Sequence, residues 1–176
     1  MKKDAEQMRS RWPEPLKALI EELEKGHQLL LRLDDEAYVR MSDSNGSVGA
    51  HFRHNLNFVE AVLGGIDTGL IDYNKRVRDR CVETDRSYAA TKFTEAIAEL
   101  QRVTASEFLH EILVASEINA TVFHRSSISR EIEFVHSHTV HHHALISEKL
   151  WVTNIATEKF FGVAPSTLEY WQSLAA

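Results

Sequence analysis

An apolar repeat near the start of the chain indicates a helical fold. Leucine and isoleucine recur at steps of three and four residues between Leu16 and Leu33, and mainly glutamate, lysine and arginine occupy the positions between them. This spacing gathers the apolar side chains on one face of an α-helix, which other elements must then cover. We therefore predict a first helix that begins after Pro13 and Pro15 and runs to about Met41.

The same periodicity predicts three further helices, over about residues 47–64, 88–107 and 129–157. Gly64 and Gly65, followed by Gly69, are expected to end the second helix, and Ser127 or Ser129 to cap the last one. The chain of 176 residues contains only 7 glycines and 3 prolines, so turn formers are scarce. A single domain over residues 1–176 with four principal helices assembles most economically as an all-α four-helix bundle.

Three other stretches lack a clean helical period. The segment 108–127 carries two short apolar runs, Ile112 to Val114 and Ile118 to Val122, which fit either a β-hairpin or an irregular loop; we favour the hairpin. The polar segment IDYNKRVRDRCVETDRSY is long for a loop in a compact domain, and such loops are usually functional or disordered. The sequence FFGVAPSTLEYW is typical of a turn with aromatic anchors.

Charge and cysteine usage exclude several classes of protein. The net charge is −6, and the 20 basic side chains are interspersed with 26 acidic ones, so no basic stripe predicts nucleic acid as a partner. The single cysteine, Cys81, allows no intramolecular disulfide. The N-terminus lacks the apolar stretch of a secretory signal, and no run approaches the roughly 18 apolar residues of a membrane span. We therefore expect a cytoplasmic protein without a membrane partner.

Histidines gather in the last predicted helix. Five of the ten lie in the string HSHTVHHH, from His136 to His143, where the helical pattern continues. His138 and His142 are four residues apart and therefore lie on one helix face, where two imidazoles can bind one ion. His141 could replace His142 in this pair. His136 and His143 point away from it, and we predict that both lie at the surface.

Two imidazoles make a weak site, because ions such as zinc take three or four ligands. The predicted second helix offers His51 and His54, which both flank its buried row, and the spacing does not choose between them. Three neutral imidazoles would leave a coordination position open, as in catalytic sites. Zinc, nickel, copper and iron all accept such ligands. The alternative is that these histidines are hydrogen-bonded core residues without a metal.

Four strings of the sequence resemble a known family. They are SVGAHFRHNLNFVEAVLGG, DYNKRVRDRCVETD, SREIEFVHSHTVHHHALI and FGVAPSTLEY, which occur in this order between about Tyr38 and Tyr170. They are similar to DinB-like members of the DinB/YfiT superfamily of metalloenzymes. The resemblance implies a four-helix bundle that binds a divalent metal ion through one histidine of the second helix and an H-x-x-x-H pair of the last long helix.

Carried over by position, the resemblance assigns the metal ligands to His51, His138 and His142. His54 and His141 would support or replace these ligands. Zinc or nickel is the expected ion, and iron is a further candidate. Members of the family often pair through bundle faces, so the resemblance is compatible with a homodimer.

The superfamily includes thiol transferases and hydrolases, so the resemblance implies a metal ion that activates water or a thiol against an unknown small-molecule substrate. Candidate catalytic residues are His54, His141 and Tyr73. In the polar segment, Arg76 and Arg78 are candidates for binding an anionic substrate, because guanidinium groups bind carboxylates bidentately. Alternatively this segment is a solvated loop with its own ion pairs, and the protein is a non-catalytic stress-response module that binds a metal or small ligand.

Overall fold

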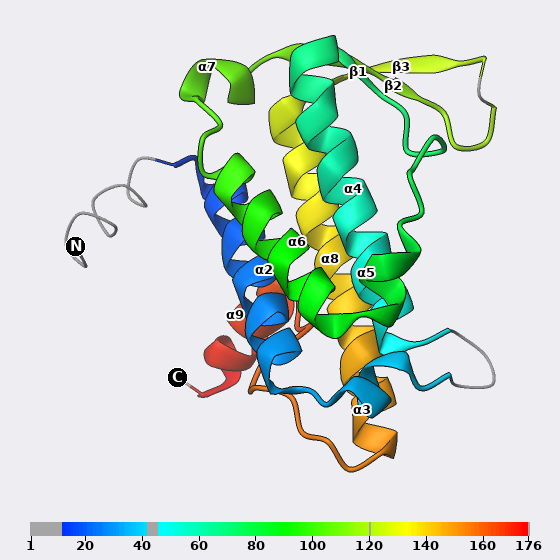
Figure 1. Cartoon of the computed structure of the whole chain (residues 1–176). Helices are drawn as coiled ribbons and strands as arrows, with labels where there is room; N and C mark the ends of the chain where they lie inside the picture. Colours follow the sequence, from blue (N-terminus) through cyan, green and yellow to red (C-terminus); the bar gives the residue numbers. More distant parts are fainter. Residues whose placement is uncertain (1–11, 42–45, 120, 176) are drawn as a thin grey trace.

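Four long helices lie side by side in the computed structural model, which describes residues 12–41, 46–119 and 121–175 (Figure 1). They are α2 (Glu14–Arg32), α4 (Val48–Thr68), α6 (Arg86–Leu100) and α8 (Ile128–Val152). Helix α8 packs against α2 and α4, and α6 packs against the same two helices. The described part of the chain is mostly helical, with one small sheet of three strands.

Short helices connect or follow the long ones. They are α3 (Asp35–Val39), α5 (Arg80–Thr84), α7 (Ala105–Phe108) and α9 (Pro165–Ala175). The predicted first helix is therefore two helices, because Leu33 is extended and the Asp34 side chain accepts the Ala37 N–H to begin α3. The predicted third helix is also divided, because Thr104 and Glu107 form a capping box that starts α7.

The other two long helices, α4 and α8, end at residues other than those at which the predicted ranges end. Of the three predicted glycines, Gly69 ends α4: the helix continues through Gly64 and Gly65 to Thr68 and stops where Gly69 adopts a left-handed conformation, with φ at 69°. Gly65 is needed for packing instead, because a Cβ there would lie 2.3 Å from the Ile71 side chain. Ser127 caps α8 as one of the two predicted candidates, and α8 ends at Val152, before residue 157.

The predicted β-hairpin is confirmed. Strands β2 (Glu111–Ala115) and β3 (Phe123–Ser127) are antiparallel, and β1 (Leu70–Ile71) pairs parallel to β2, so that Leu113 lies between Leu70 and Arg125. The second strand starts later than predicted, at Phe123, and residue 120 lies outside the described residues. The sheet crosses one end of the long helices and leads directly into α8 (Figure 1).

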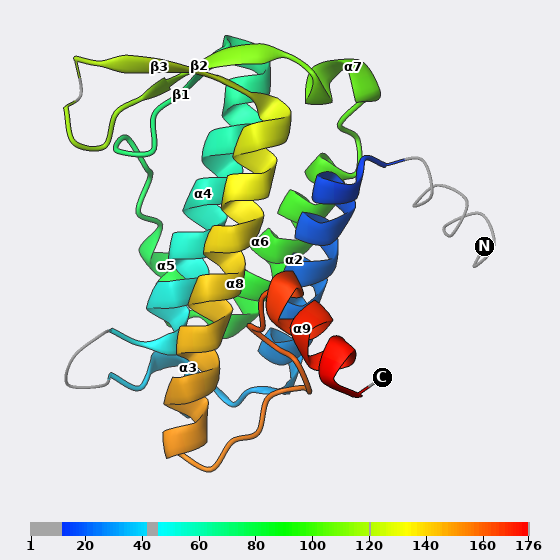
Figure 2. The same cartoon turned by 180° about the vertical axis from the view of Figure 1, so that it is seen from behind.

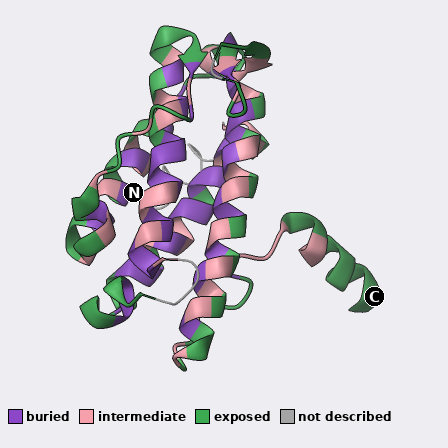
Figure 3. Ribbon diagram, turned by 90° about the vertical axis from the view of Figure 1, so that its right-hand side faces the viewer, coloured by how far each residue is buried: buried purple, intermediate pink, exposed green. Residues whose placement is uncertain are grey.

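The core lies between the long helices, whose inward faces are buried along most of their length (Figure 3). Apolar residues of all four contribute to it, and Phe52 of α4 meets Phe93 of α6 edge to face at 5.3 Å between ring centroids. The burial of this large apolar surface is the main stabilising contribution to such a fold. Among the described residues, none of the helices has the length and apolar character needed to cross a membrane.

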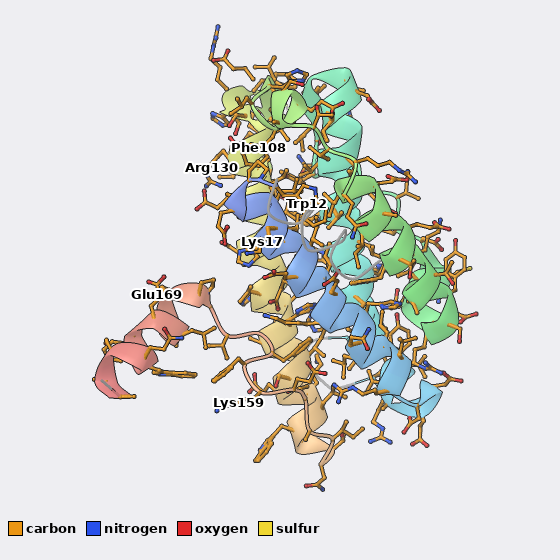
Figure 4. All side chains as sticks on the ribbon, turned by 90° about the vertical axis from the view of Figure 1, so that its left-hand side faces the viewer. Trp12, Lys17, Phe108, Arg130, Lys159 and Glu169 are labelled. Carbon is orange, nitrogen blue, oxygen red and sulfur yellow. The ribbon has the colours of Figure 1, made fainter. Side chains whose placement is uncertain are left out.

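The C-terminal segment corrects the prediction of a turn. Residues Pro165–Ala175 form the helix α9, which has no buried residue. In Figure 2, α9 lies in front of α2 and α8, and Figure 4 shows that it stands off the long helices, with Glu169 on its first turns. The predicted aromatic anchor exists, but it is Phe161 alone that is buried, whereas Trp171 is exposed.

Two glycines of α4 are expected to respond oppositely to alanine. A Cβ at Gly49 would lie 2.1 Å from the Glu83 carbonyl oxygen, so Gly49→Ala should force α5 away and lower the free energy of unfolding by about 2 kcal/mol. Gly64 has open space around its Cα, so Gly64→Ala should raise that free energy by about 0.5–1 kcal/mol. Urea unfolding measures both. A neutral Gly49→Ala variant would contradict the close packing of α5 on α4.

Candidate metal centre

Four histidines form one cluster between α4 and α8, which run in opposite directions (Figure 1). His54 of α4 lies against His138 and His142 of α8, with ring centroids between 4.5 and 4.9 Å apart for the three pairs. Each of these three residues offers a ring nitrogen within 4.8 Å of the other two. The structure therefore brings together the i,i+4 pair of α8 and a histidine of the facing helix.

His51 joins the cluster from the preceding turn of α4. Its Nδ1 lies 2.8 Å from Nδ1 of His142, and the two ring centroids are 5.1 Å apart. His142 therefore contacts both α4 histidines, whereas the close group of three contains His54. The assignment of His51 as a metal ligand stays a prediction, with His54 as the alternative that the sequence also left open.

Burial keeps His54, His138 and His142 uncharged at neutral pH. It lowers the pKa of His54 and of His138 to about 4, and the pKa of His142 to about 3. Neighbouring histidines add to each shift, and the charge of Arg76 adds to those of His54 and His138. Neutral imidazoles keep the lone pairs that bind a metal, so no proton must leave before an ion enters at pH 7.

The donor set fits a transition-metal ion. Imidazole nitrogen suits zinc, nickel, copper and iron, and nitrogens on one tetrahedral zinc ion lie about 3.4 Å apart when each bond is about 2.1 Å. In the cluster of His54, His138 and His142 the ring nitrogens lie within 4.8 Å of one another, so they would have to approach one another to bind one zinc ion. Nε2 of His138 is buried without a hydrogen-bonding partner among the described residues. Since buried polar atoms normally have a partner, this nitrogen is consistent with a ligand to an ion.

His138 lies at one end of a stack of aromatic rings that also contains Phe58 and Tyr73. Phe58 stacks on His138 at 4.0 Å, and Tyr73 stacks on the other side of Phe58 at 4.8 Å. The Tyr73 hydroxyl donates to the buried carboxylate of Glu131 at 2.8 Å, and Ser126 donates to the same carboxylate at 2.6 Å. Tyr73, a predicted catalytic candidate, is therefore separated from the cluster by Phe58, and its place in the stack suits a supporting role.

The segment after β1 covers one edge of the cluster. Nη1 of Arg76 lies 3.5 Å from Nδ1 of His54, and its guanidinium carbon lies 4.9 Å from the centroid of the Phe58 ring. Asn57 of α4 donates to the Val77 carbonyl at 2.7 Å, which ties the segment to the helix. Arg78 is exposed and, within the described residues, makes no hydrogen bond or ion pair. The two predicted anion-binding arginines thus differ, and only Arg76 reaches the histidines.

The remaining histidines of α8 differ in their environments. His141 is exposed, and its ring meets the His142 ring edge to face at 5.4 Å. His136 is half-buried. The prediction that His143 lies at the surface is wrong: it is fully buried against α2, and its Nδ1 lies 2.6 Å from Oε1 of Glu22. In the sequence Glu22 stands among other charged residues of α2, directly before Leu23 of the apolar row, so its pairing with His143 becomes visible only in the structure.

Comparison with known proteins bears on the fold. No family model matches the chain. A crystal structure of a DinB-like protein (YjoA) from Bacillus subtilis superimposes with a TM-score of 0.62, covering 85% of this chain and 99% of that one, at 15% sequence identity. The chain has a DinB-like fold. The resemblance found in the sequence is thus confirmed at the level of the fold, and α4 and α8 carry the histidines within this DinB-like arrangement.

A curated relative covers only part of the chain. FK506-binding protein 5 from Rhizopus delemar is 26% identical over 105 residues, which are 57% of this chain. The matched region spans 27% of the length of that protein. This partial match adds nothing on the histidine cluster, and the DinB-like fold is the likeness that bears on it.

Acid is expected to destabilise the metal-free protein already above pH 5. The unfolded histidines titrate near 6.5, whereas burial holds the pKa of His54 and His138 near 4. Between these values the unfolded chain binds more protons than the folded one, so the free energy of unfolding falls as the pH falls. Urea unfolding at pH 7, 6 and 5 measures the slope. His54→Gln should flatten it and the exposed His141→Gln should not; a pH-independent stability would contradict the burial of the cluster.

Proposed function

We propose that the long helices α2, α4, α6 and α8 form a four-helix bundle of the DinB/YfiT type that binds one divalent metal ion. The imidazoles of His138 and His142 would hold the ion together with His51, His54 or both. The observation that carries this proposal is the convergence of three neutral imidazoles, with ring nitrogens within 4.8 Å of one another, from two facing helices. Zinc or nickel fits best, and iron is a further candidate.

We further propose that the site is catalytic, as a hydrolase or thiol transferase. Held by His138, His142 and an imidazole of α4, a divalent ion would supply an activated nucleophile, because it would lower the pKa of a water or thiol toward neutrality. Around it, the stacked rings of Phe58 and Tyr73 would restrict water, and the exposed imidazole of His141 would exchange protons with solvent. Arg76 would bind an anionic group of the substrate within reach of His54.

Arg76 is expected to select anionic substrates. A charge-assisted contact of this kind contributes about 1.5–3 kcal/mol, so Arg76→Leu should raise the KM for an ester that carries a carboxylate about 10- to 100-fold. The KM for the matching uncharged ester should stay unchanged. Arg78→Leu is the matched control, because Arg78 is exposed and lies in the same segment. Equal losses in the two variants would contradict the assignment to Arg76.

Activity screens before and after chelation test the proposed function. The protein loaded with zinc or nickel should turn over at least one member of an ester and amide panel, or of a panel that pairs a thiol with electrophiles. The activity should disappear with a chelator, return with added metal, and be absent in His138→Ala. If chelation lowers only the unfolding temperature and no panel gives turnover, the protein is a non-catalytic metal-binding module.

A further inference from the structure

Glu131 is a buried acid whose hydrogen-bonding partners carry no positive charge. It is 8% exposed, and its carboxylate accepts hydrogen bonds from the Ser126 hydroxyl at 2.6 Å and from the Tyr73 hydroxyl at 2.8 Å. Within the described residues it forms no ion pair. Burying a carboxylate costs free energy of folding, and the N-terminal turn of α8, where Glu131 lies, offsets only part of that cost. This placement points to a role besides the stability of α8.

The tyrosine that Glu131 holds is the outer ring of the aromatic stack. Tyr73 is 2% exposed and stacks on Phe58 with 17° between the ring planes, and Phe58 stacks on His138 with 22° between the planes. Glu131 and His138 are seven residues apart on α8, so they lie on one face of the helix, two turns apart. That face therefore carries a candidate metal ligand and also the acid that fixes the far end of the stack.

Stacking of this kind suits the orientation of a metal ligand. An imidazole binds an ion through a lone pair in the plane of its ring, so the tilt of the ring sets the direction of the bond. In many metal sites a carboxylate that accepts from the second ring nitrogen fixes this tilt. Here Phe58 covers a face of His138, and the ring edge that carries both nitrogens is not part of the contact. A rotation of Tyr73 or Phe58 would therefore change the tilt of His138.

We propose that Glu131 is a positioning residue of the metal centre, which acts on His138 through Tyr73 and Phe58. The inference rests on the proposed metal binding, and it gives Tyr73 a role in orientation in place of proton transfer. A charged acceptor makes a shorter and stronger hydrogen bond than a neutral one, so a carboxylate holds the Tyr73 hydroxyl more firmly than an amide would. Ser126 of β3 holds the same carboxylate, so the hairpin contributes to the position of the acid.

Zinc affinity, measured by competition with a chelator, tests the inference. Tyr73→Phe removes only the hydroxyl and should weaken zinc binding about 10-fold, the lower end of the range for residues that orient metal ligands. Glu131→Leu should lose as much, whereas Glu131→Gln keeps an oxygen acceptor for Tyr73 and should recover most of that loss. The double variant Tyr73→Phe/Glu131→Leu should lose no more than either single variant, because each substitution breaks the same connection.

Tyr38→Phe is the matched control. Tyr38 is also a buried tyrosine, and its hydroxyl donates to the Val82 carbonyl, away from the stack. Its loss should lower the free energy of unfolding of the metal-free protein, as Tyr73→Phe does, yet leave the zinc affinity unchanged. Equal losses of zinc affinity in the two variants would assign the effect to a general loosening of the fold and overturn the proposal, as would an unchanged affinity in Tyr73→Phe.

Nuclear magnetic resonance of the metal-free protein separates this inference from the metal site itself. The ring protons of His138, assigned with His138→Gln, should be shifted upfield by the stacked Phe58 ring in the wild type and in Tyr38→Phe. In Tyr73→Phe and Glu131→Leu these resonances should move downfield, because the stack is no longer held in one arrangement. Resonances that stay in place would overturn the inference. A wild type that binds no zinc would contradict the proposed function, and the movement of the resonances would still establish that Glu131 orients His138.

Discussion

Replacing Glu22 with leucine is expected to lower the free energy of unfolding by about 3 kcal/mol, although the substitution adds an apolar residue to the core. Burial alone would raise the pKa of Glu22, but His143 and Lys25 outweigh it and hold the pKa below its ordinary value. Burial lowers the pKa of His143, so a neutral ring donates from Nδ1 to a charged carboxylate 2.6 Å away. Leucine would leave this N–H buried without a partner.

A double-mutant cycle attributes the loss to the pair. His143→Leu should cost about 3 kcal/mol, because it leaves Oε1 of the buried Glu22 carboxylate without its partner while Lys25 still contacts Oε2, and Glu22→Leu/His143→Leu should recover at least about 2 kcal/mol of the summed losses. Urea unfolding of metal-free protein at pH 7 gives these values. Lys25→Ala is the control and should cost less than about 1 kcal/mol, since its side chain is partly exposed. Additive losses would show that the two side chains do not stabilise the fold as a pair.

Removing single histidines of the cluster is expected to divide the four residues into two classes. His138→Ala and His142→Ala should each lower zinc affinity at least about 100-fold, more than the 10- to 100-fold effect known for supporting residues around metal ligands. His51→Ala or His54→Ala alone should cost about 10-fold, because His142 contacts both and the remaining imidazole can complete the site. The double variant His51→Ala/His54→Ala should lose as much as His138→Ala.

Competition with a chromophoric zinc chelator measures these affinities. His141→Ala is the matched control, since this neighbouring histidine is exposed and should bind zinc like the wild type. A single α4 variant that loses as much affinity as the double variant would identify that residue as the sole third ligand. Unchanged affinity in His138→Ala would exclude the cluster as the binding site.

The helical period predicts the parts of this fold that depend on one chain segment at a time. It predicts α2, α4 and α8 from their apolar stripes, and the shared face of His138 and His142 follows from their spacing on α8. The period does not predict which neighbouring helix covers a given face. His143 was for this reason predicted at the surface, whereas it lies against Glu22, 121 residues earlier in the chain.

The same limit applies to the third ligand and to α9. His51 and His54 both flank the buried row of α4, and only the position of α8 brings each of them to His142. The helix after Pro165 has a Gly-Val-Ala-Pro approach that is typical of a turn, and none of its residues is buried by the described chain. Sequence patterns therefore predict the elements and the chemistry, while the pairing of faces requires the structure.

Metal analysis of the untagged protein by mass spectrometry tests the central claim most directly. The wild type should contain about one equivalent of zinc, nickel or iron per chain, and His138→Ala/His142→Ala should contain less than about a tenth of an equivalent while keeping its helical circular dichroism spectrum. A wild type that is free of metal and also fails to bind added zinc and nickel would contradict the account, and would identify the cluster as packed core histidines.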